Sequence, residues 1–323
     1  MAPTPLDAVH RNVPTTRLTV LGVPNSASAY CMGVERAPAA LREAGLLEAL
    51  SATGLEVVDA GDLTMRPWRP DPRHPFAQNV DEEAEATAEL AAAAGTLLGK
   101  GRRLLVLGGS CVVAIGVCAG MRIAGARPQL VYLDRHLDLN TPASTTEGSL
   151  SWMGMAHALG LEGAVPELMD AAGRSPILAP ADLVYLGADL TDGTTQWERD
   201  QIEALGIEIV GQAAMCADPT RAATRARGHL ADEPYVVHLD VDVLDFLDAP
   251  IAENVNGRNS GPTISALGRS LAVLIGDPQC WGLSIGQLDP NHAASDPTAL
   301  PRLIGTLGAA FTPAPSAGEE LAT

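Results

Sequence analysis

Two acidic segments of the chain have the residue types and spacing of a metal site. In the first, Asp134, His136 and Asp138 alternate directly after the apolar run LVYL. In the second, Asp240 and Asp242 alternate directly after YVVHL. Alternate residues of an extended chain project from the same side, about 6.6–7 Å apart. Each segment therefore predicts side chains that face one common place.

Carboxylates gathered in this way repel each other unless cations neutralise them or some of them take up protons. Carboxylate and imidazole donors suit Mn²⁺ or a similar first-row ion, and shared carboxylates suit two ions about 3.5–4 Å apart. Two such ions acidify a bound water, which supplies hydroxide for attack on an electrophilic carbon. Either segment alone is more typical of a solvated turn than of a metal site. The presence of both favours a hydrolytic two-metal site.

Apolar runs of strand length recur along the whole chain, and each acidic segment follows one of them. The predicted strands are Leu18–Pro24, Leu55–Asp59, Arg103–Leu107, Gln129–Leu133, Asp182–Leu186, Ile207–Val210, Tyr235–Leu239 and Trp281–Ile285. Several are apolar almost throughout, which is typical of strands buried on both faces of a parallel sheet. Helices are predicted between them, at Pro38–Leu50, Asp81–Gly99 and Thr263–Ile275. This alternation predicts an α/β fold.

The predicted fold also indicates where a site lies. Ligands of open parallel sheets bind beyond the carboxyl ends of the strands. The two acidic segments stand at such ends, and Gly108-Gly109-Ser110-Cys111 follows the third predicted strand. We therefore expect all three segments to meet at one edge of the sheet.

Composition excludes several classes of function. The 323 residues include 39 acidic and 21 basic ones, for a net charge of −18, and only 3% are aromatic. This balance argues against a nucleic-acid or anionic-membrane partner. Five scattered cysteines do not form a disulfide framework. We see no signal peptide and no membrane-spanning run, so a cytoplasmic protein is expected.

No linker divides the chain, so one domain is predicted over residues 1–312. Residues 313–323 are rich in Pro, Ala, Gly and Glu. Such a composition cannot bury enough apolar surface to fold, and it predicts a flexible tail.

The ordered segments resemble the ureohydrolases, the family of arginases and agmatinases, over roughly Arg17 to Phe311. The resemblance begins with GVPNSASAYCMGVERAPAALREAGL, and LGGSC stands at the family's Gly-Gly-Asp-His type motif. YLDRHLDLNTPAS matches its Asp-Ala-His-x-Asp motif, and HLDVDVLD its Asp-x-Asp-x-x-Asp motif. The resemblance implies a three-layer α/β/α sandwich around an eight-stranded parallel sheet, with two Mn²⁺ per subunit. It also implies a homo-oligomer, a trimer or hexamer, whose metal-bridging hydroxide cleaves a linear C–N bond of a small guanidine or amidine.

The resemblance further implies a set of metal ligands. One metal would be held by Cys111, Asp134, Asp138 and Asp240, and the other by Asp134, His136, Asp240 and Asp242. Asp138 would also orient the hydroxide, which makes it the catalytic carboxylate. Most of the family has a histidine where this chain has Cys111. A thiolate is a softer ligand than Mn²⁺ prefers, so Cys111 is either a ligand typical of one branch or a small buried residue.

Two further departures concern catalysis. The family's Gly-Asn-x-His-Gly segment corresponds to GSLSWMGM from Gly148, so the proton-shuttling histidine is replaced by Ser151 or, if the glycines are aligned, by Met153. We take Ser151 as the catalytic candidate, while His157 is expected to be structural. Gln287 stands where a glutamate pairs with the substrate guanidinium. Gln287 can accept a hydrogen bond but carries no charge, unless Asp289 supplies one from a shifted position.

The remaining substrate-binding candidates are Asn140, Thr145 and Asp192, together with Gln287. The departures indicate that L-arginine is not the natural substrate and favour a modified or hydroxylated guanidine. The alternative is a catalytically silent or repurposed metal-binding relative with a structural or regulatory role.

Overall fold

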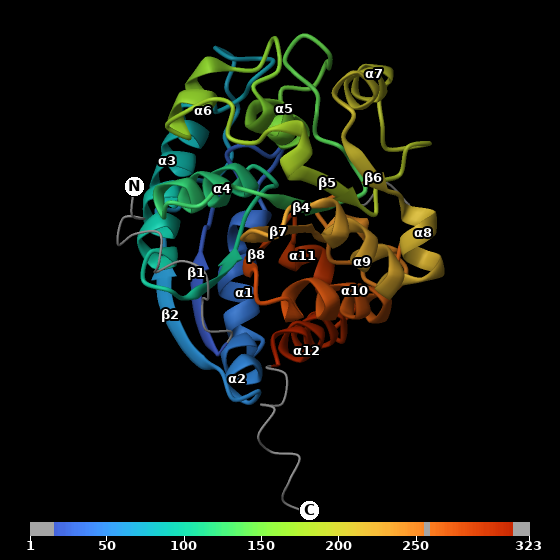
Figure 1. The fold of residues 1–323 in the computed structure, drawn as a ribbon. Helices are drawn as coiled ribbons and strands as arrows, with labels where there is room; N and C mark the ends of the chain where they lie inside the picture. Colours follow the sequence, from blue (N-terminus) through green and yellow to red (C-terminus); the bar gives the residue numbers. More distant parts are fainter. Residues whose placement is uncertain (1–15, 255–258, 313–323) are drawn as a thin grey trace, which may run out of the picture.

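The computed structural model describes residues 16–254 and 259–312. The predicted tail at 313–323 and the first fifteen residues of the predicted domain lie outside this part of the chain. All the elements described below belong to one body built around one sheet (Figure 1).

All eight predicted strands form, and all pair in parallel in a single sheet of order β2-β1-β3-β8-β7-β4-β5-β6. The strands are β1 (Arg17–Gly22), β2 (Glu56–Asp62), β3 (Arg103–Leu107), β4 (Leu130–Leu133), β5 (Leu183–Leu186), β6 (Glu208–Val210), β7 (Tyr235–Asp240) and β8 (Cys280–Gly286). The predicted α/β class and the eight-stranded parallel sheet are therefore confirmed.

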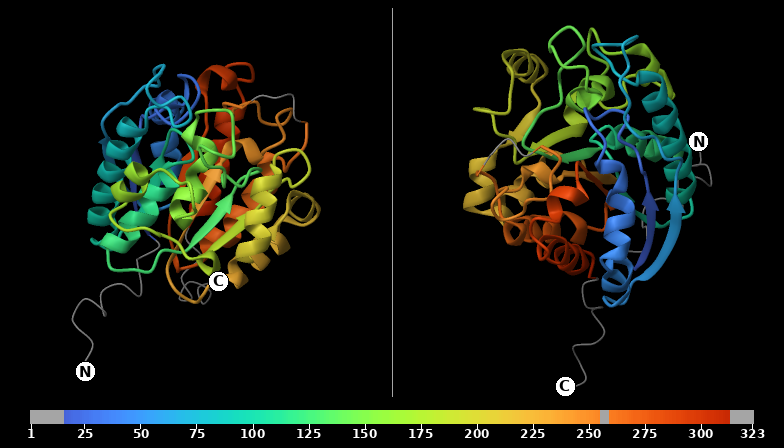
Figure 2. Two further views of the ribbon diagram at one scale, coloured as in Figure 1. Left: turned by 90° about the horizontal axis from the view of Figure 1, so that it is seen from above. Right: turned by 180° about the vertical axis from the view of Figure 1, so that it is seen from behind.

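Helices cover both faces of the sheet, as a three-layer sandwich requires (Figure 2). One face packs against α3 (Val80–Leu98), α4 (Val113–Ile123), α5 (Gly154–Leu159), α6 (Pro166–Ala171) and α7 (Gln196–Leu205). The other packs against α1 (Ala37–Glu43), α2 (Leu46–Ser51), α8 (Gln212–Ala217), α9 (Pro219–His229), α10 (Ile264–Gly276), α11 (Pro290–Ala293) and α12 (Ala299–Phe311). Strand β3 shows why its last four residues are all apolar. Leu105 and Leu107 enter one core cluster, and Leu104 and Val106 enter the other.

The helix predictions were right in two places and wrong in one. Helices α3 and α10 begin and end within one residue of the predicted bounds, and the Thr263 side chain caps α10 by accepting the Ala266 N–H at 3.2 Å. The predicted helix Pro38–Leu50 is instead two helices, α1 and α2. Gly45 lies between them in a left-handed conformation, with φ of 91°. This conformation ends a helix and favours glycine.

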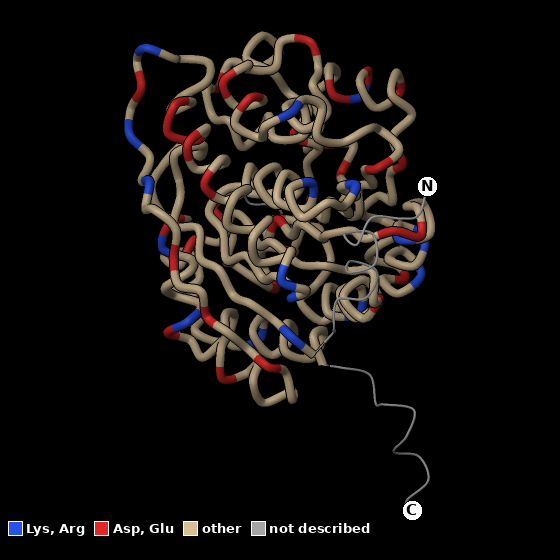
Figure 3. Tube along the Cα trace, turned by 60° about the vertical axis from the view of Figure 1, so that its left-hand side comes forward, with Lys and Arg blue, Asp and Glu red and all other residues tan. Residues whose placement is uncertain are grey.

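Acidic and basic residues are interspersed along the chain trace (Figure 3). Among the helices of the described residues, none is long and apolar enough to cross a membrane. The expected homo-oligomer, the cytoplasmic location and the absence of nucleic-acid partners stay predictions.

Candidate metal centre

The predicted ligands converge at the carboxyl end of the central strands. Cys111 follows β3, Asp134 and His136 follow β4, and Asp240 ends β7. Their ligand atoms form two groups, each with all atoms within 4.8 Å of one another: Asp134, His136, Asp240 and Asp242 in one, and Cys111, Asp134 and Asp138 in the other. The Cys111 thiol also donates to Asp240 Oδ2 at 2.8 Å. Asp134 is common to both groups, as the predicted bridging role requires.

Local backbone contacts hold the carboxylates in place. Asp134 Oδ1 accepts the His136 N–H at 2.6 Å, and Asp240 Oδ1 accepts the Asp242 N–H at 2.8 Å. Each of these aspartates thus turns the chain sharply at the end of its strand. Asp138 has a positive φ of 51°, a conformation that costs energy for a residue with a side chain. The turn aims the third carboxylate back towards the other two.

The Gly-Gly pair after β3 allows the loop carrying Cys111 to approach the sheet edge closely. A Cβ added to Gly109 would lie 1.5 Å from the carbonyl oxygen of Asn25. No side chain fits there, so the glycine has a structural reason independent of chemistry.

The donor set fits divalent cations. First-row ions bind such atoms at roughly 2.0–2.2 Å, so ligand atoms on opposite sides of one ion lie up to about 4.4 Å apart. Both groups are close to this span. All six side chains are at least 95% buried, yet Asp242 Oδ1 has no hydrogen-bond partner among the described residues. A buried, unpartnered carboxylate oxygen beside other carboxylates is a position that a cation would stabilise.

Electrostatics within the metal-free cluster support the same conclusion. Burial, together with the charge of Asp242, raises the pKa of Asp134 to about 6. Burial and neighbouring carboxylates also raise the pKa of Asp138, Asp240 and the Cys111 thiol well above their usual values. Without cations, these groups retain protons at pH values where exposed carboxylates are ionised. Cation binding would therefore displace protons from this cluster.

Side chains on the central strands contact the candidate ligands, and the sequence analysis did not identify these contacts. The Tyr132 hydroxyl donates to Asp138 Oδ2 at 2.5 Å. The Tyr132 ring stacks on His238, with centroids 5.0 Å apart, and His238 Nδ1 lies 2.9 Å from the hydroxyl of Ser284. Tyr132 and His238 each precede a candidate ligand aspartate by two residues, so the two-residue period of a strand places each of them on the same side as that aspartate. This spacing could have identified both residues from the sequence.

Of the two candidates for the missing histidine, the structure brings Ser151 to the cluster. Ser151 lines the inner cavity with Cys111 and the ligand carboxylates, and its hydroxyl lies 2.7 Å from that of Ser149. Met153 is fully buried in the hydrophobic core. His157 is structural, as predicted. Its Nδ1 donates to the Met153 carbonyl at 2.6 Å, and its Nε2 accepts the Val165 N–H at 2.9 Å.

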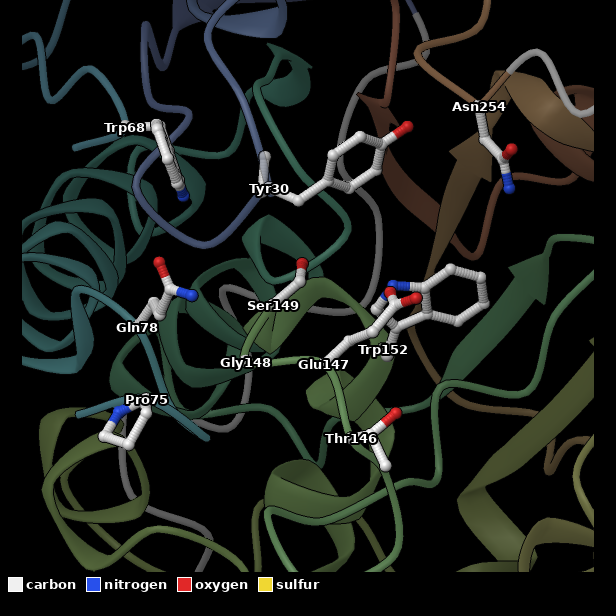
Figure 4. Close-up of a pocket in the computed structure, with 11 residues that line it drawn as sticks. Tyr30, Trp68, Pro75, Gln78, Thr146, Glu147, Gly148, Ser149, Trp152 and Asn254 are labelled. Atoms are coloured by element: carbon white, nitrogen blue, oxygen red, sulfur yellow. The ribbon is translucent and has the colours of Figure 1, made fainter. Parts of the chain in front are cut away.

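An outer pocket of about 460 Å³ opens beside the inner cavity, whose free volume of about 10 Å³ holds roughly one water-sized sphere. Tyr30, Trp152 and Asn254 line both. Figure 4 shows three aromatic rings around this outer pocket, those of Tyr30, Trp68 and Trp152, together with the Glu147 carboxylate. Loops that follow β1, β2, β4 and β7 build it. None of its lining residues in the described part of the chain is Lys, Arg or His.

Three predicted substrate-binding residues lie elsewhere. Within the described residues, the linings of these two cavities do not include Asn140, Thr145 or Asp192. The side-chain oxygen of Asn140, Oδ1, accepts from the hydroxyls of Ser144 and Thr195 at 3.1 and 3.2 Å. Thr145 accepts the N–H of the nearby Glu147, and Asp192 is exposed on the loop after β5. Their predicted role in binding substrate stays a prediction.

Gln287 does reach the cluster and lines the inner cavity. Its backbone also has a positive φ, of 59°. The alternative carboxylate, Asp289, instead caps α11, where its Oδ1 accepts the Asn291 N–H at 2.8 Å. The structure therefore brings Gln287 to the cavity and places Asp289 at a helix end.

Comparison with known proteins agrees with this geometry. Residues 16–300 match the model of the Arginase family. The arginase of Bacillus caldovelox is 31% identical over 241 residues, which cover 72% of this chain and 78% of that protein. The native structure of the B. caldovelox arginase superposes with a TM-score of 0.80 at 24% identity, covering 93% of this chain and all of the other.

A formiminoglutamase variant of Trypanosoma cruzi, whose crystal structure was determined with Mn²⁺, superposes with a TM-score of 0.70 at 15% identity. The superposition covers 97% of this chain and 99% of the formiminoglutamase chain. The predicted class of enzyme, a hydrolase acting on amidine-type C–N bonds, is confirmed at the level of the family. The chain belongs to the Arginase family.

Proposed function

We propose that this protein is a Mn²⁺-dependent hydrolase with two metal sites, which cleaves a linear C–N bond in a guanidine or amidine other than L-arginine. One observation supports this above all. Two groups of potential ligands, which share Asp134, lie together at the sheet edge where family members are expected to hold their metals. Carboxylate and imidazole ligands match Mn²⁺, and the Cys111 sulfur is the one soft donor.

Two bound cations would acidify a water between them and supply hydroxide at neutral pH. The chain itself would orient and protonate the reactants. The Asp138 carboxylate, held by the Tyr132 hydroxyl, is placed to hold a proton at the cavity. Ser151 faces the same cavity and is hydrogen-bonded to Ser149 in the outer pocket. This hydroxyl pair is the route we propose for a proton to the departing nitrogen.

The outer pocket supports a substrate without an α-carboxylate. The inner cavity has room for about one water-sized group, so nearly all of a substrate lies in the outer pocket. A carboxylate there would find no cationic partner among the described lining residues and would meet Glu147. Burying a charge without a partner is costly. Aromatic rings instead favour a flat, apolar or cationic group.

The test uses purified protein loaded with Mn²⁺ and a panel of alkyl, aryl and N-hydroxylated guanidines, with L-arginine included. Release of urea or hydroxyurea is measured, and metal content is determined in parallel. We expect about two Mn²⁺ per chain, and turnover of at least one guanidine without a carboxylate that exceeds turnover of L-arginine. No turnover by any compound at full metal content contradicts the proposed activity. Fewer than one Mn²⁺ per chain contradicts the proposed site.

A further inference from the structure

We propose that Glu253 provides the negative charge that recognises the amidinium or guanidinium end of the substrate. The neutral side chain of Gln287 cannot provide that charge. The inference rests on the proposed function for the class of substrate. It makes Glu253 a specificity-determining residue that acts together with Gln287.

Backbone pairing places the two residues opposite each other. Ala252 and Leu288 form an antiparallel bridge. On one side of the bridge the Glu253 N–H donates to the Gln287 carbonyl at 2.7 Å, and on the other the Asp289 N–H donates to Ile251 at 2.8 Å. Residues opposite each other in such a pair have Cβ atoms about 4.5–5.5 Å apart. Glu253 is thus fixed beside a residue that lines the inner cavity.

Both side chains present buried acceptor oxygens without a donor. Glu253 is 2% exposed and Gln287 is 7% exposed. The Cys31 thiol donates to Glu253 Oε1 at 3.5 Å, but Glu253 Oε2 has no partner in the described part of the chain. Gln287 Oε1 has none there either. Two unpartnered buried acceptors are costly unless a ligand supplies N–H groups.

The neighbours of Glu253 line the two cavities, and its own buried carboxylate lies behind that lining. Asn254, the next residue, lines both cavities, and so does Tyr30. Burial raises the pKa of the Tyr30 phenol, and among nearby charges the Glu253 carboxylate adds most to that shift. The carboxylate therefore acts on a ring that stands between the inner and outer cavities.

An amidinium group is the ligand that these acceptors fit. It is planar, it carries several N–H donors and a positive charge, and charge-assisted hydrogen bonds are about twice as strong as neutral ones. Burial raises the pKa of Glu253 to about 7, so a cation favours its ionised form. A neutral isostere such as a urea offers N–H donors but leaves this carboxyl group either protonated or charged without compensation. The pair should therefore select cations over neutral isosteres.

The test compares two probes, butylguanidinium and butylurea, binding to the Mn²⁺-loaded protein by calorimetry. The unmodified protein should bind butylguanidinium more tightly. Glu253→Gln should weaken butylguanidinium binding by about 10-fold or more and leave butylurea binding nearly unchanged. Moving the charge in the double variant Glu253→Gln/Gln287→Glu should restore most of the loss. Metal content and thermal unfolding are measured for every variant.

Glu83→Gln is the matched control, because Glu83 is also 2% exposed but its carboxylate already accepts a hydrogen bond from Asn25 Nδ2 at 2.8 Å. It should leave the binding of both probes unchanged. Equal affinity of the unmodified protein for the two probes overturns the inference without any variant. So does a Glu253→Gln protein that binds both probes normally or loses both equally, or a double variant that stays weak. If binding behaves as expected but no guanidine is hydrolysed, the proposed activity fails and the role of Glu253 stands.

Discussion

Replacing Asp134 by asparagine should have opposite effects on the metal-free and the metal-loaded protein. Asp134 belongs to both ligand groups, and its Oδ1 accepts the His136 N–H. The asparagine carbonyl can accept the same bond. The substitution therefore removes a charge and a metal ligand while it keeps the turn.

The effect on the metal-free protein follows from the pKa of Asp134, which burial and the charge of Asp242 raise from 3.8 to about 6. A carboxyl whose pKa is raised by folding stabilises the fold least when it is ionised. The contribution of this group to the free energy of unfolding is fully present below about pH 4, and it is lost as the pH rises through 6. About two pKa units correspond to about 3 kcal/mol at pH 8. Asp134→Asn avoids this loss, so its metal-free Tm at pH 8 should be higher by roughly 4–5 °C.

Mn²⁺ reverses the order. A ligand that binds only the folded state stabilises it in proportion to the logarithm of its affinity, so 100-fold weaker binding contributes about 2.7 kcal/mol less for each ion. Asp134 belongs to both ligand groups, so weaker binding at both sites removes about 5 kcal/mol, more than the variant gains without metal. Unfolding is followed by scanning calorimetry at pH 5 and pH 8, with EDTA or with Mn²⁺. Asp71→Asn is the control, because Asp71 is only 8% exposed but lies outside both ligand groups. An Asp134→Asn protein that Mn²⁺ stabilises as much as the unmodified protein would refute the bridging role. An unchanged metal-free Tm at pH 8 would refute the electrostatic argument.

Three other changes test further parts of the structure. Burial lowers the pKa of His157 to about 4. Unfolding titrations should therefore show about 3 kcal/mol of stability lost as the pH falls from 6.5 to 4. His157→Gln should flatten the plot of stability against pH in that range. Cys111→His should raise Mn²⁺ affinity and reduce its pH dependence in calorimetric titrations, because the buried thiol holds its proton tightly; unchanged affinity would indicate that Cys111 is no ligand. Gly109→Ala should cost several kcal/mol in denaturant unfolding, since its Cβ would meet Asn25; a variant of normal stability would contradict the close approach.

The strands and the convergence of the acidic side chains were predictable from local patterns, whereas Cys111 entered as a candidate ligand only through the family resemblance. An apolar run such as LVYL has one way to satisfy its backbone and bury both its faces, which is the interior of a parallel sheet. The position of Asp134 directly after that run then determines the edge at which it lies. Spacing by two residues predicted which acidic side chains share a side, and the structure brings those side chains together.

Contacts between distant segments decided which other residues surround the candidate ligands. Nothing near Glu253 in the sequence marks it, because its opposite residue, Gln287, lies 34 positions further along the chain and the two meet through one backbone bridge. The outer pocket likewise combines Tyr30, Trp68 and Trp152 from three separate loops. The amino-acid sequence by itself determined the sheet, its chemically active edge and the kind of ion that edge suits, because those depend on residues close together in the chain. Only the tertiary structure decided which other groups surround the ligands, because loop packing sets distances that no local spacing encodes.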